Sequence, residues 1–179
     1  MKIIEFYNQA KQNIIQKGYQ KEIDWVENRQ FNDQNITTFF GEYMYVVINS
    51  GMKNQVAEGI YRRAMKAGMS AVGHPQKRKA LELGMKMKEQ WFQELKEKKT
   101  FTEQLEYLET LPFIGPVTKY HLARNLGIDC AKPDRHLVRL AEKYGYDNVQ
   151  EMCQFISDAV GDRIGTVDVV LWRYSNLKA

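Results

Sequence analysis

The fold of this chain is decided by residues 111–140, which read LPFIGPVTKYHLARNLGIDCAKPDRHLVRL. Gly115 lies in a short turn, and Pro116 follows it at a place where helices accept proline in their first turn. A helix that begins here exposes backbone N–H groups at its positive end, where an anion can bind. The same letters also fit an ordinary turn between two core helices, so the turn alone decides nothing.

Apolar residues recur at helical spacing along the rest of the chain, and no segment alternates convincingly like a strand. Glycines and prolines punctuate this pattern at short intervals. We therefore expect an all-α protein of roughly ten helices. Three helices have both limits marked: one from Thr37 or Thr38 to Gly51, one from about Asn54 to Ala67, and one from Pro75 to Lys99. The first helix ends at Gly18. Further helices begin at Thr102, Pro116, Pro133 and Thr166.

Charge is unevenly distributed along the 179 residues. Residues 53–99 hold twelve basic and five acidic side chains, whereas the rest of the chain is slightly acidic and the whole carries a net charge of +4. A basic segment of this kind favours a polyanionic partner. A solvated helix face with a few extra lysines is the alternative, and charge alone does not separate the two.

The cysteine content and the N-terminus exclude several classes of protein. Cys130 and Cys153 are the only cysteines, and no Cys-x-x-Cys pair occurs, so we expect neither an iron–sulfur cluster nor a zinc site. Charged side chains occur within the first five residues, which does not fit a signal peptide, and no apolar run reaches the length of a membrane span. We expect a cytoplasmic protein that needs no metal or cofactor.

Two motifs within residues 111–140 resemble the helix-hairpin-helix (HhH-GPD) superfamily of DNA glycosylases, which includes endonuclease III and the adenine, 8-oxoguanine and alkyladenine glycosylases. The family hairpin reads L-P-G-[VI]-G-x-x-T-A, and a motif D-x-H-x-x-R follows about one helix later. Weaker resemblance covers most of residues 37–175. The matching residues are Leu111, Pro112, Ile114, Gly115 and Thr118 in the hairpin, and Asp134, His136 and Arg139 in the second motif.

The resemblance implies a two-lobed helical bundle with the active site in a cleft between the lobes. Residues 1–20 would form an N-terminal helix that packs with the C-terminal lobe. Residues 21–110 would form a helical lobe with a plug turn and the basic segment, and residues 111–179 the hairpin and the catalytic lobe. The implied partner is double-stranded DNA that contains a modified base, bound by a monomer.

Asp134 is the expected catalytic residue. Hydrolysis of an N-glycosidic bond passes through a sugar with oxocarbenium character, so a carboxylate beside C1′ stabilises the developing charge and can activate water. The position of Asp134 just after Pro133 is also typical of a helix N-cap, which is a purely structural role. Both roles can hold together.

Two hairpin positions depart from the family pattern. Members that also cleave the strand carry a nucleophilic lysine two residues after the second hairpin glycine, and this position is Val117, which cannot form a Schiff base. Lys119 lies about half a helical turn away. The resemblance therefore implies a monofunctional glycosylase. Phe113 replaces the first glycine of the motif. It is therefore an open question whether this hairpin makes the family's phosphate contact and whether it binds a monovalent cation.

Further site residues follow from the resemblance, each with a structural alternative in the core. His121, Tyr45 and Trp172 are candidates for contact with the flipped base. Asp168 is another, and an aspartate among apolar neighbours needs a partner if it is buried. Gly51 stands where the family carries its plug residue, so Met52 or Lys53 would replace it. The expected DNA contacts are Phe113, Gly115, Val117, Thr118, Lys119, His136, Met52 and Lys53.

The sequence thus predicts a monofunctional DNA glycosylase that acts through Asp134. A non-catalytic helix-hairpin-helix DNA-binding module is the main alternative, and an enzyme with lyase activity from another lysine is a third. The excised base stays open, as does a role in base excision repair or in defence against modified phage DNA.

Overall fold

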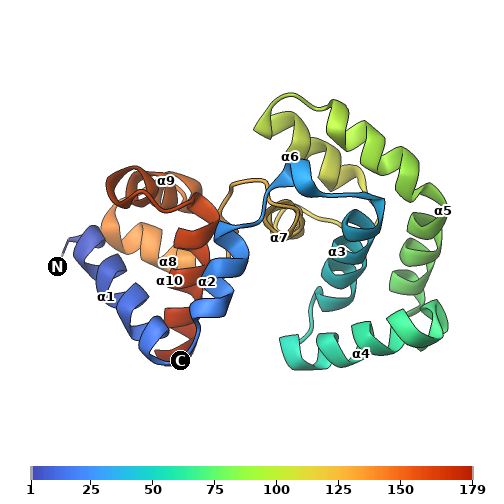
Figure 1. Cartoon of the computed structure of the whole chain (residues 1–179), viewed down its shortest axis with the longest axis horizontal. Helices are drawn as coiled ribbons and strands as arrows, with labels where there is room; N and C mark the ends of the chain where they lie inside the picture. The colour runs from blue at the N-terminus through green and yellow to red at the C-terminus, as the bar shows by residue number, and fades with distance from the viewer. Residues whose placement is uncertain (1, 179) are drawn as a thin grey trace. The chain divides into compact units, whose positions relative to one another are not determined.

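The computed structural model describes residues 2–178 and confirms the all-α class (Figure 1). Within these residues there are two short 3-10 helices, Phe31–Asp33 and Met69–Ala71, and no strand. The ten α-helices are α1 (Ile3–Gln16), α2 (Gln20–Glu27), α3 (Ile36–Asn49), α4 (Asn54–Ala67), α5 (Pro75–Glu97), α6 (Phe101–Thr110), α7 (Thr118–Asn125), α8 (Arg135–Tyr144), α9 (Val149–Val160) and α10 (Ile164–Lys178).

Helix starts differ from the expected positions by two residues in several places. Asn35 caps α3 and Thr100 caps α6, because each side chain accepts a hydrogen bond from the backbone N–H three residues later. Helix α7 begins at Thr118 rather than at Pro116, and α10 begins at Ile164 rather than at Thr166. No helix of the described residues combines the length and the apolar character that crossing a membrane requires.

The chain forms two compact units. Unit 1 contains residues 1–31 and 127–179, and unit 2 contains residues 32–126. The expected boundaries at 20 and 110 were therefore wrong in two respects: α2 belongs to unit 1, and the hairpin belongs to unit 2. The physical reason is packing, since α2 contacts α10, whereas the hairpin helices α6 and α7 contact each other and α7 contacts α3.

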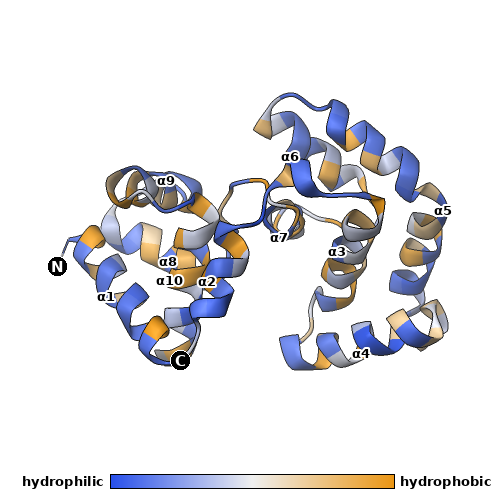
Figure 2. Cartoon of the chain, in the orientation of Figure 1, coloured by the Kyte–Doolittle hydropathy of each residue, from blue (hydrophilic) through white to orange (hydrophobic). Residues whose placement is uncertain are grey.

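Unit 1 is built around α10, which packs against α1, α2, α8 and α9. Val167, Val170 and Leu171 of α10 are fully buried, and so are Tyr7 and Ile14 of α1. Hydrophobic residues of these helices face one another, as the colouring in Figure 2 shows. The first helix thus packs with the C-terminal helices, as the resemblance implied.

Unit 2 is built around α3, which packs against α4, α5 and α7. Tyr43 lies at the centre of this core and contacts Trp91 of α5 edge to face, with ring centroids 5.5 Å apart. Gly84 permits this approach, because a Cβ atom there would lie 2.8 Å from the Tyr43 ring. The interior of unit 2 therefore depends on a close contact between α3 and α5.

Candidate functional site

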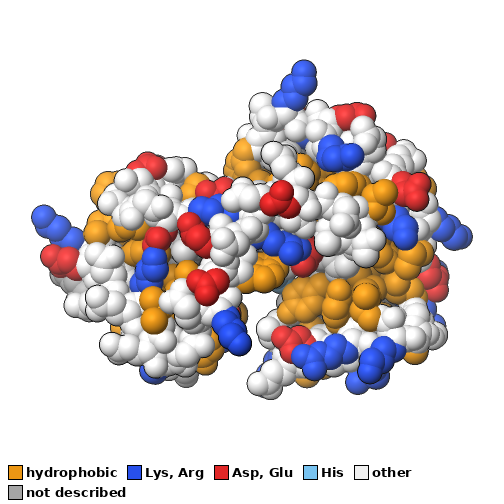
Figure 3. Space-filling view, in the orientation of Figure 1, with side chains coloured by type: hydrophobic (Ala, Val, Ile, Leu, Met, Phe, Trp, Pro, Cys, Tyr) orange, Lys and Arg blue, Asp and Glu red, His pale blue; other side chains and the backbone are white. Residues whose placement is uncertain are grey.

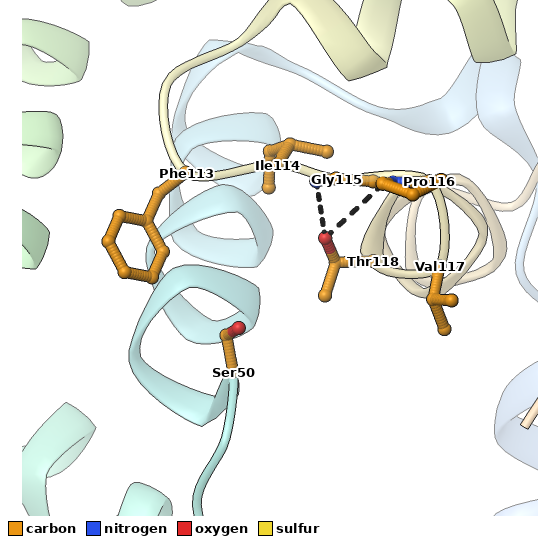
Figure 4. Close-up of a pocket in the computed structure, with 7 residues that line it drawn as sticks. All are labelled: Ser50, Phe113, Ile114, Gly115, Pro116, Val117 and Thr118. Atoms are coloured by element: carbon orange, nitrogen blue, oxygen red, sulfur yellow. Dashed lines mark hydrogen bonds between the residues drawn. The ribbon is translucent and has the colours of Figure 1, made fainter.

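The hairpin of unit 2 is a tight turn between α6 and α7. Leu111 and Ile114 are buried and anchor it, and the N–H of Ile114 donates to the carbonyl of Leu111 at 3.1 Å. The N–H of Gly115 donates to the Thr118 hydroxyl at 2.7 Å, which closes the turn onto the first residue of α7 (Figure 4). Thr118 therefore has a structural role within the hairpin itself.

The start of α7 leaves two backbone donors open. Among the described residues, none accepts a hydrogen bond from the N–H of Val117 or of Thr118. Pro116 has no N–H, and the N–H of Gly115 is already bonded to Thr118. The anion site that the sequence predicts would therefore consist of the N–H groups of Val117 and Thr118, at the positive end of the helix dipole.

An open groove of about 490 Å³ runs along this edge, and we call it the hairpin groove. It is lined by Ser50, at the end of α3, and by residues 113–118 (Figure 4). Ser50 belongs to the predicted plug turn, so one surface joins that turn to the hairpin. In the same turn, Gly51 has a positive φ of 71°, Met52 is half-buried, and Lys53 is exposed at the N-cap position of α4, where its side chain makes no capping hydrogen bond.

Phe113 has the one positive φ, 66°, of any non-glycine residue among residues 2–178. An L-residue pays roughly 1–2 kcal/mol for this left-handed conformation, which glycine adopts freely. Phe113 therefore holds a backbone conformation that favours glycine. The ring is 37% exposed and contacts His74 edge to face, with ring centroids 5.7 Å apart.

Lys77 was not foreseen from the sequence, yet it supports the hairpin groove. Its side chain is only 3% exposed, and its ammonium donates to the carbonyls of Ile48, at 2.8 Å, and Ser50, at 2.6 Å. The same ammonium lies over the Phe113 ring, 5.7 Å from the centroid. Burial lowers the pKa of Lys77. This lysine therefore ties the end of α3 to the hairpin.

The two hairpin positions that concern lyase chemistry differ sharply. Val117 is 42% exposed beside the groove, so its position is accessible but offers no amine. Lys119 is partly buried and pairs with Glu109 of α6. An amine that is held by a carboxylate is less free to attack a sugar, and the same pairing weakens the expected DNA contact of Lys119.

In unit 1, Asp134 is the N-cap of α8. Its Oδ1 accepts hydrogen bonds from the backbone N–H of His136, at 2.8 Å, and of Leu137, at 3.0 Å. No described residue donates to its Oδ2, and the side chain is half-buried. The structure thus confirms the capping role, which uses Oδ1 only. His136 contributes its backbone N–H to this cap, and its side chain is half-buried.

The segment 127–134 that leads to Asp134 is held by four side chains of unit 1. Arg163 donates to the carbonyls of Val26 and Gly127, each at 3.0 Å, and to that of Arg29. The other three contacts join Asp129 to the Gly165 N–H, at 2.9 Å, Gln150 to the Ala131 N–H, at 2.9 Å, and Asp168 to the Lys132 N–H, at 2.8 Å.

Gly127 makes the start of this segment possible. Its φ is 85°, and a Cβ atom there would lie 2.6 Å from the carbonyl carbon of Gln30 and 2.7 Å from the Phe31 nitrogen. The backbone of the segment therefore approaches the backbone after α2 as closely as only glycine allows. The path to Asp134 is fixed at its first residue.

Asp168 and Trp172 lie on α10 in different surroundings. Asp168 is 1% exposed, and its bond to the Lys132 N–H supplies the partner that a buried aspartate needs. The carboxylate thus holds the segment before Asp134. Trp172 is partly buried against the core of unit 1, with the Arg173 guanidinium 4.7 Å from its ring centroid.

The structure brings His121 and Tyr45 together within unit 2. Their rings meet edge to face with centroids 6.1 Å apart, and Tyr45 contacts Tyr61 in the same way at 5.6 Å. The Tyr45 hydroxyl donates to the side chain of Asn54 at 2.6 Å. Burial, followed by the charges of Glu58 and Glu42, raises the pKa of Tyr45. This cluster offers aromatic surface from α3, α4 and α7.

Basic side chains of the segment 53–99 are exposed on α4 and α5. Figure 3 shows lysine and arginine side chains gathered along α4, where Arg62, Arg63 and Lys66 are exposed. Arg62 makes a loose pair with Glu58 at 3.6 Å.

Cys130 and Cys153 are buried free thiols, and burial raises the pKa of Cys153. Within residues 2–178, no cluster of acidic, histidine or cysteine side chains has the geometry of a metal site.

Solved structures share this architecture at low sequence identity. The 8-oxoguanine glycosylase/lyase of Methanocaldococcus jannaschii, in complex with a 15mer DNA containing 8-oxoguanine, matches with a TM-score of 0.73 and 17% identity over 96% of both chains. The 8-oxoguanine DNA glycosylase of Thermotoga maritima matches with a TM-score of 0.70 and 18% identity over 94% of both chains. Neither a protein-family model nor a curated protein matches the sequence. The chain therefore has the all-helical fold of these 8-oxoguanine DNA glycosylases.

Proposed function

We propose that this protein is a monofunctional DNA N-glycosylase, which hydrolyses the bond between a modified base and its deoxyribose. The observation that carries the proposal is Asp134, whose carboxylate is fixed through one oxygen at the start of α8 while the other has no described donor. The anion site at Val117 and Thr118 and the fold shared with 8-oxoguanine glycosylases support it.

In the proposed reaction, the bond between C1′ and the base nitrogen breaks as the sugar gains positive charge. The carboxylate of Asp134 stabilises this charge and accepts a proton from the attacking water, whose oxygen bonds to C1′. The base leaves with the bonding electron pair and takes up a proton. The products are a free base and an abasic site in an intact strand.

The hydrolytic course of the proposal rests on Val117. A lyase reaction needs an amine that attacks C1′ and forms a Schiff base, and valine offers none. Lys119, the nearest lysine along α7, is paired with Glu109. The M. jannaschii protein is a glycosylase/lyase, so this chain would share its fold and differ in this part of its chemistry.

Binding to double-stranded DNA would combine three features. The N–H groups of Val117 and Thr118 would hold a phosphate, and the exposed basic residues of α4 would add attraction that weakens with salt. His121 and Tyr45, whose rings meet edge to face in unit 2, would contact the extruded base. We assign no metal or cofactor to the reaction, and we expect the protein to act as a monomer.

The test is base release from a panel of duplexes, each with one modified base. The panel starts with 8-oxoguanine, because both similar structures are 8-oxoguanine glycosylases, and adds alkylated purines, uracil and glucosylated hydroxymethylcytosine. We expect a free base, identified by its mass, and a strand that stays uncut until alkali is added. Tight binding to every duplex without release of any base would favour the non-catalytic DNA-binding module instead.

Borohydride trapping tests whether the protein lacks a lysine that attacks the sugar. The wild-type protein should give no covalent complex with a releasable substrate, whereas the Val117→Lys variant should give one, because an amine then stands at the exposed position beside the groove. Trapping of the wild type would show that another lysine serves as the nucleophile.

A further inference from the structure

Phe113 adds a side chain where the hairpin needs none. Its backbone has a φ of 66°, which glycine would adopt without strain, and the turn is closed by other contacts, from Leu111 to Ile114 and from Gly115 to Thr118. What Phe113 contributes at this position is therefore its ring. That ring is 37% exposed and lines the hairpin groove.

The ring is held in a fixed orientation by the first turn of α5. The Lys77 ammonium lies over it at 5.7 Å from the centroid, and His74 meets it edge to face. Lys77 is itself fixed by the carbonyls of Ile48 and Ser50. Figure 4 shows the ring extending from the hairpin beside the end of α3 at Ser50. A rigid and partly exposed aromatic ring is a ready stacking surface.

The occupant of the groove follows from its two ends. One end presents the open N–H groups of Val117 and Thr118, which suit a phosphate, and the other presents the Phe113 ring, which suits a flat apolar group. A nucleotide carries both groups, and the basic charge of residues 53–99 favours a polyanion. We propose that Phe113 stacks on a nucleobase of the DNA strand whose phosphate is bound at the start of α7.

The stacking of Phe113 on a base rests on the proposed function, in which DNA is the partner, and adds which form of DNA the hairpin prefers. In an intact duplex the base faces are covered by their neighbours, so the ring reaches one only where a base step is open, as beside an abasic site or an extruded nucleotide. Side chains such as phenylalanine stack on bases in this way in other DNA-binding proteins. Phe113 would therefore favour binding to DNA with a disrupted base stack. Because its side chain is neutral, it would do so without changing how DNA binding depends on salt.

The experiment compares binding to two duplexes of one sequence, one intact and one with a tetrahydrofuran abasic-site analogue, by fluorescence anisotropy. Phe113→Leu keeps an apolar side chain and removes the aromatic face. We expect it to weaken binding to the abasic duplex about tenfold and to the intact duplex less than twofold. Phe113→Tyr should stay within about twofold of wild type on both. Phe155→Leu removes a 50% exposed ring from α9 and should change neither affinity.

Phe113→Gly separates the ring from the backbone. It relieves the positive φ, so its melting temperature should not fall below that of Phe113→Leu, while its affinity for the abasic duplex should fall about tenfold. Wild-type affinity of either variant for the abasic duplex would overturn the proposal, and so would an equal loss on both duplexes. If the wild-type protein releases no base but still needs Phe113 to bind the abasic duplex, the proposed glycosylase activity is rejected and the proposed stacking of Phe113 is supported.

Discussion

The segment before Asp134 in unit 1 and the hairpin in unit 2 are built in opposite ways. The segment 127–134 has backbone groups held by the side chains of Arg163, Gln150 and Asp168, and its own Asp129 side chain accepts from the N–H of Gly165. The hairpin instead leaves donors open at the start of α7 and carries a strained residue, Phe113, at its tip.

This difference matches the two tasks that we propose. A group that must meet a transition state is most effective when its position is fixed before the reaction, which the contacts around residues 127–134 provide. A surface that must bind a phosphate needs donors that nothing else in the protein uses. The contrast predicts that changes in unit 1 affect the rate of base release, and changes in the hairpin affect DNA binding.

Asp134→Asn should have the largest effect. We expect the rate of base release to fall by about 100- to 1,000-fold, because the amide carries no negative charge to stabilise the sugar cation. Asparagine caps helices as well as aspartate does, so folding and DNA binding should persist. Single-turnover base release, thermal melting and anisotropy measure the three quantities. Asp158→Asn, an exposed site on α9, is the control, and unchanged turnover of Asp134→Asn would reject the catalytic role.

Arg163→Met tests whether the segment before Asp134 needs its anchors. The change removes the guanidinium hydrogen bonds to the carbonyls of Val26, Arg29 and Gly127, and we expect a loss of about 2–4 kcal/mol in the free energy of unfolding. The rate of base release should fall as well, because the backbone of residues 127–134 is then less firmly held and Asp134 is less precisely positioned. Arg173→Met removes a more exposed pair with Glu22 and should cost less than about 1 kcal/mol. Equal losses in both variants would contradict the special role of Arg163.

The fold class and the main motifs could be predicted from the sequence because they depend on local patterns. Helical spacing gave the all-α class, and the residues around Asp134 predicted both its capping role and its candidate chemistry. The apolar neighbours of Asp168 implied that it needs a partner if it is buried, and the structure shows it buried and bonded to the Lys132 N–H. Each of these features is encoded within a few turns of helix.

The remaining features depend on contacts between distant parts of the sequence. Arg163 reaches Gly127 across 36 residues, and Lys77 reaches Ile48 across 29, so no local pattern indicates either contact. The same reason explains the wrong unit boundaries, since the hairpin was assigned by its place in the sequence and not by its packing on α3. Phe113 was visible as a departure from glycine, but its contacts with His74 and Lys77 were not.

Tyr43→Phe should have a smaller effect in unit 2. The buried Tyr43 hydroxyl donates to the carbonyl of Pro112, at 2.8 Å, directly before Phe113. Its loss should cost about 1–2 kcal/mol in stability and weaken DNA binding, because the hairpin loses a support. Tyr107→Phe removes a hydroxyl of the same unit that bonds to Glu94, and it should leave DNA binding unchanged. The prediction fails if both variants bind DNA like the wild type.

The smallest expected effect concerns Tyr7, the buried tyrosine of unit 1. Its hydroxyl donates to Asp162 at 2.5 Å, and burial, followed by this bond to a carboxylate, raises the pKa of Tyr7 well above its usual range. Between pH 10 and that raised pKa, the unfolded chain has lost the tyrosine proton and the folded chain still holds it. The unfolded state then binds fewer protons, so the free energy of unfolding must fall as the pH rises above about 10.

Tyr7→Phe should therefore show a cost that depends on pH. At pH 8 we expect it to be less stable than wild type by about 1 kcal/mol, since the bond to Asp162 is lost while Lys11 still pairs with that carboxylate. Above pH 10 the wild type loses stability through Tyr7 and the variant does not, so the difference should shrink by up to about 1.4 kcal/mol for each pH unit. Urea unfolding at pH 8, 10 and 11 measures it. A difference that stays constant with pH would mean that Tyr7 ionises as easily in the folded protein as in the unfolded chain, and that the bond to Asp162 does not hold its proton.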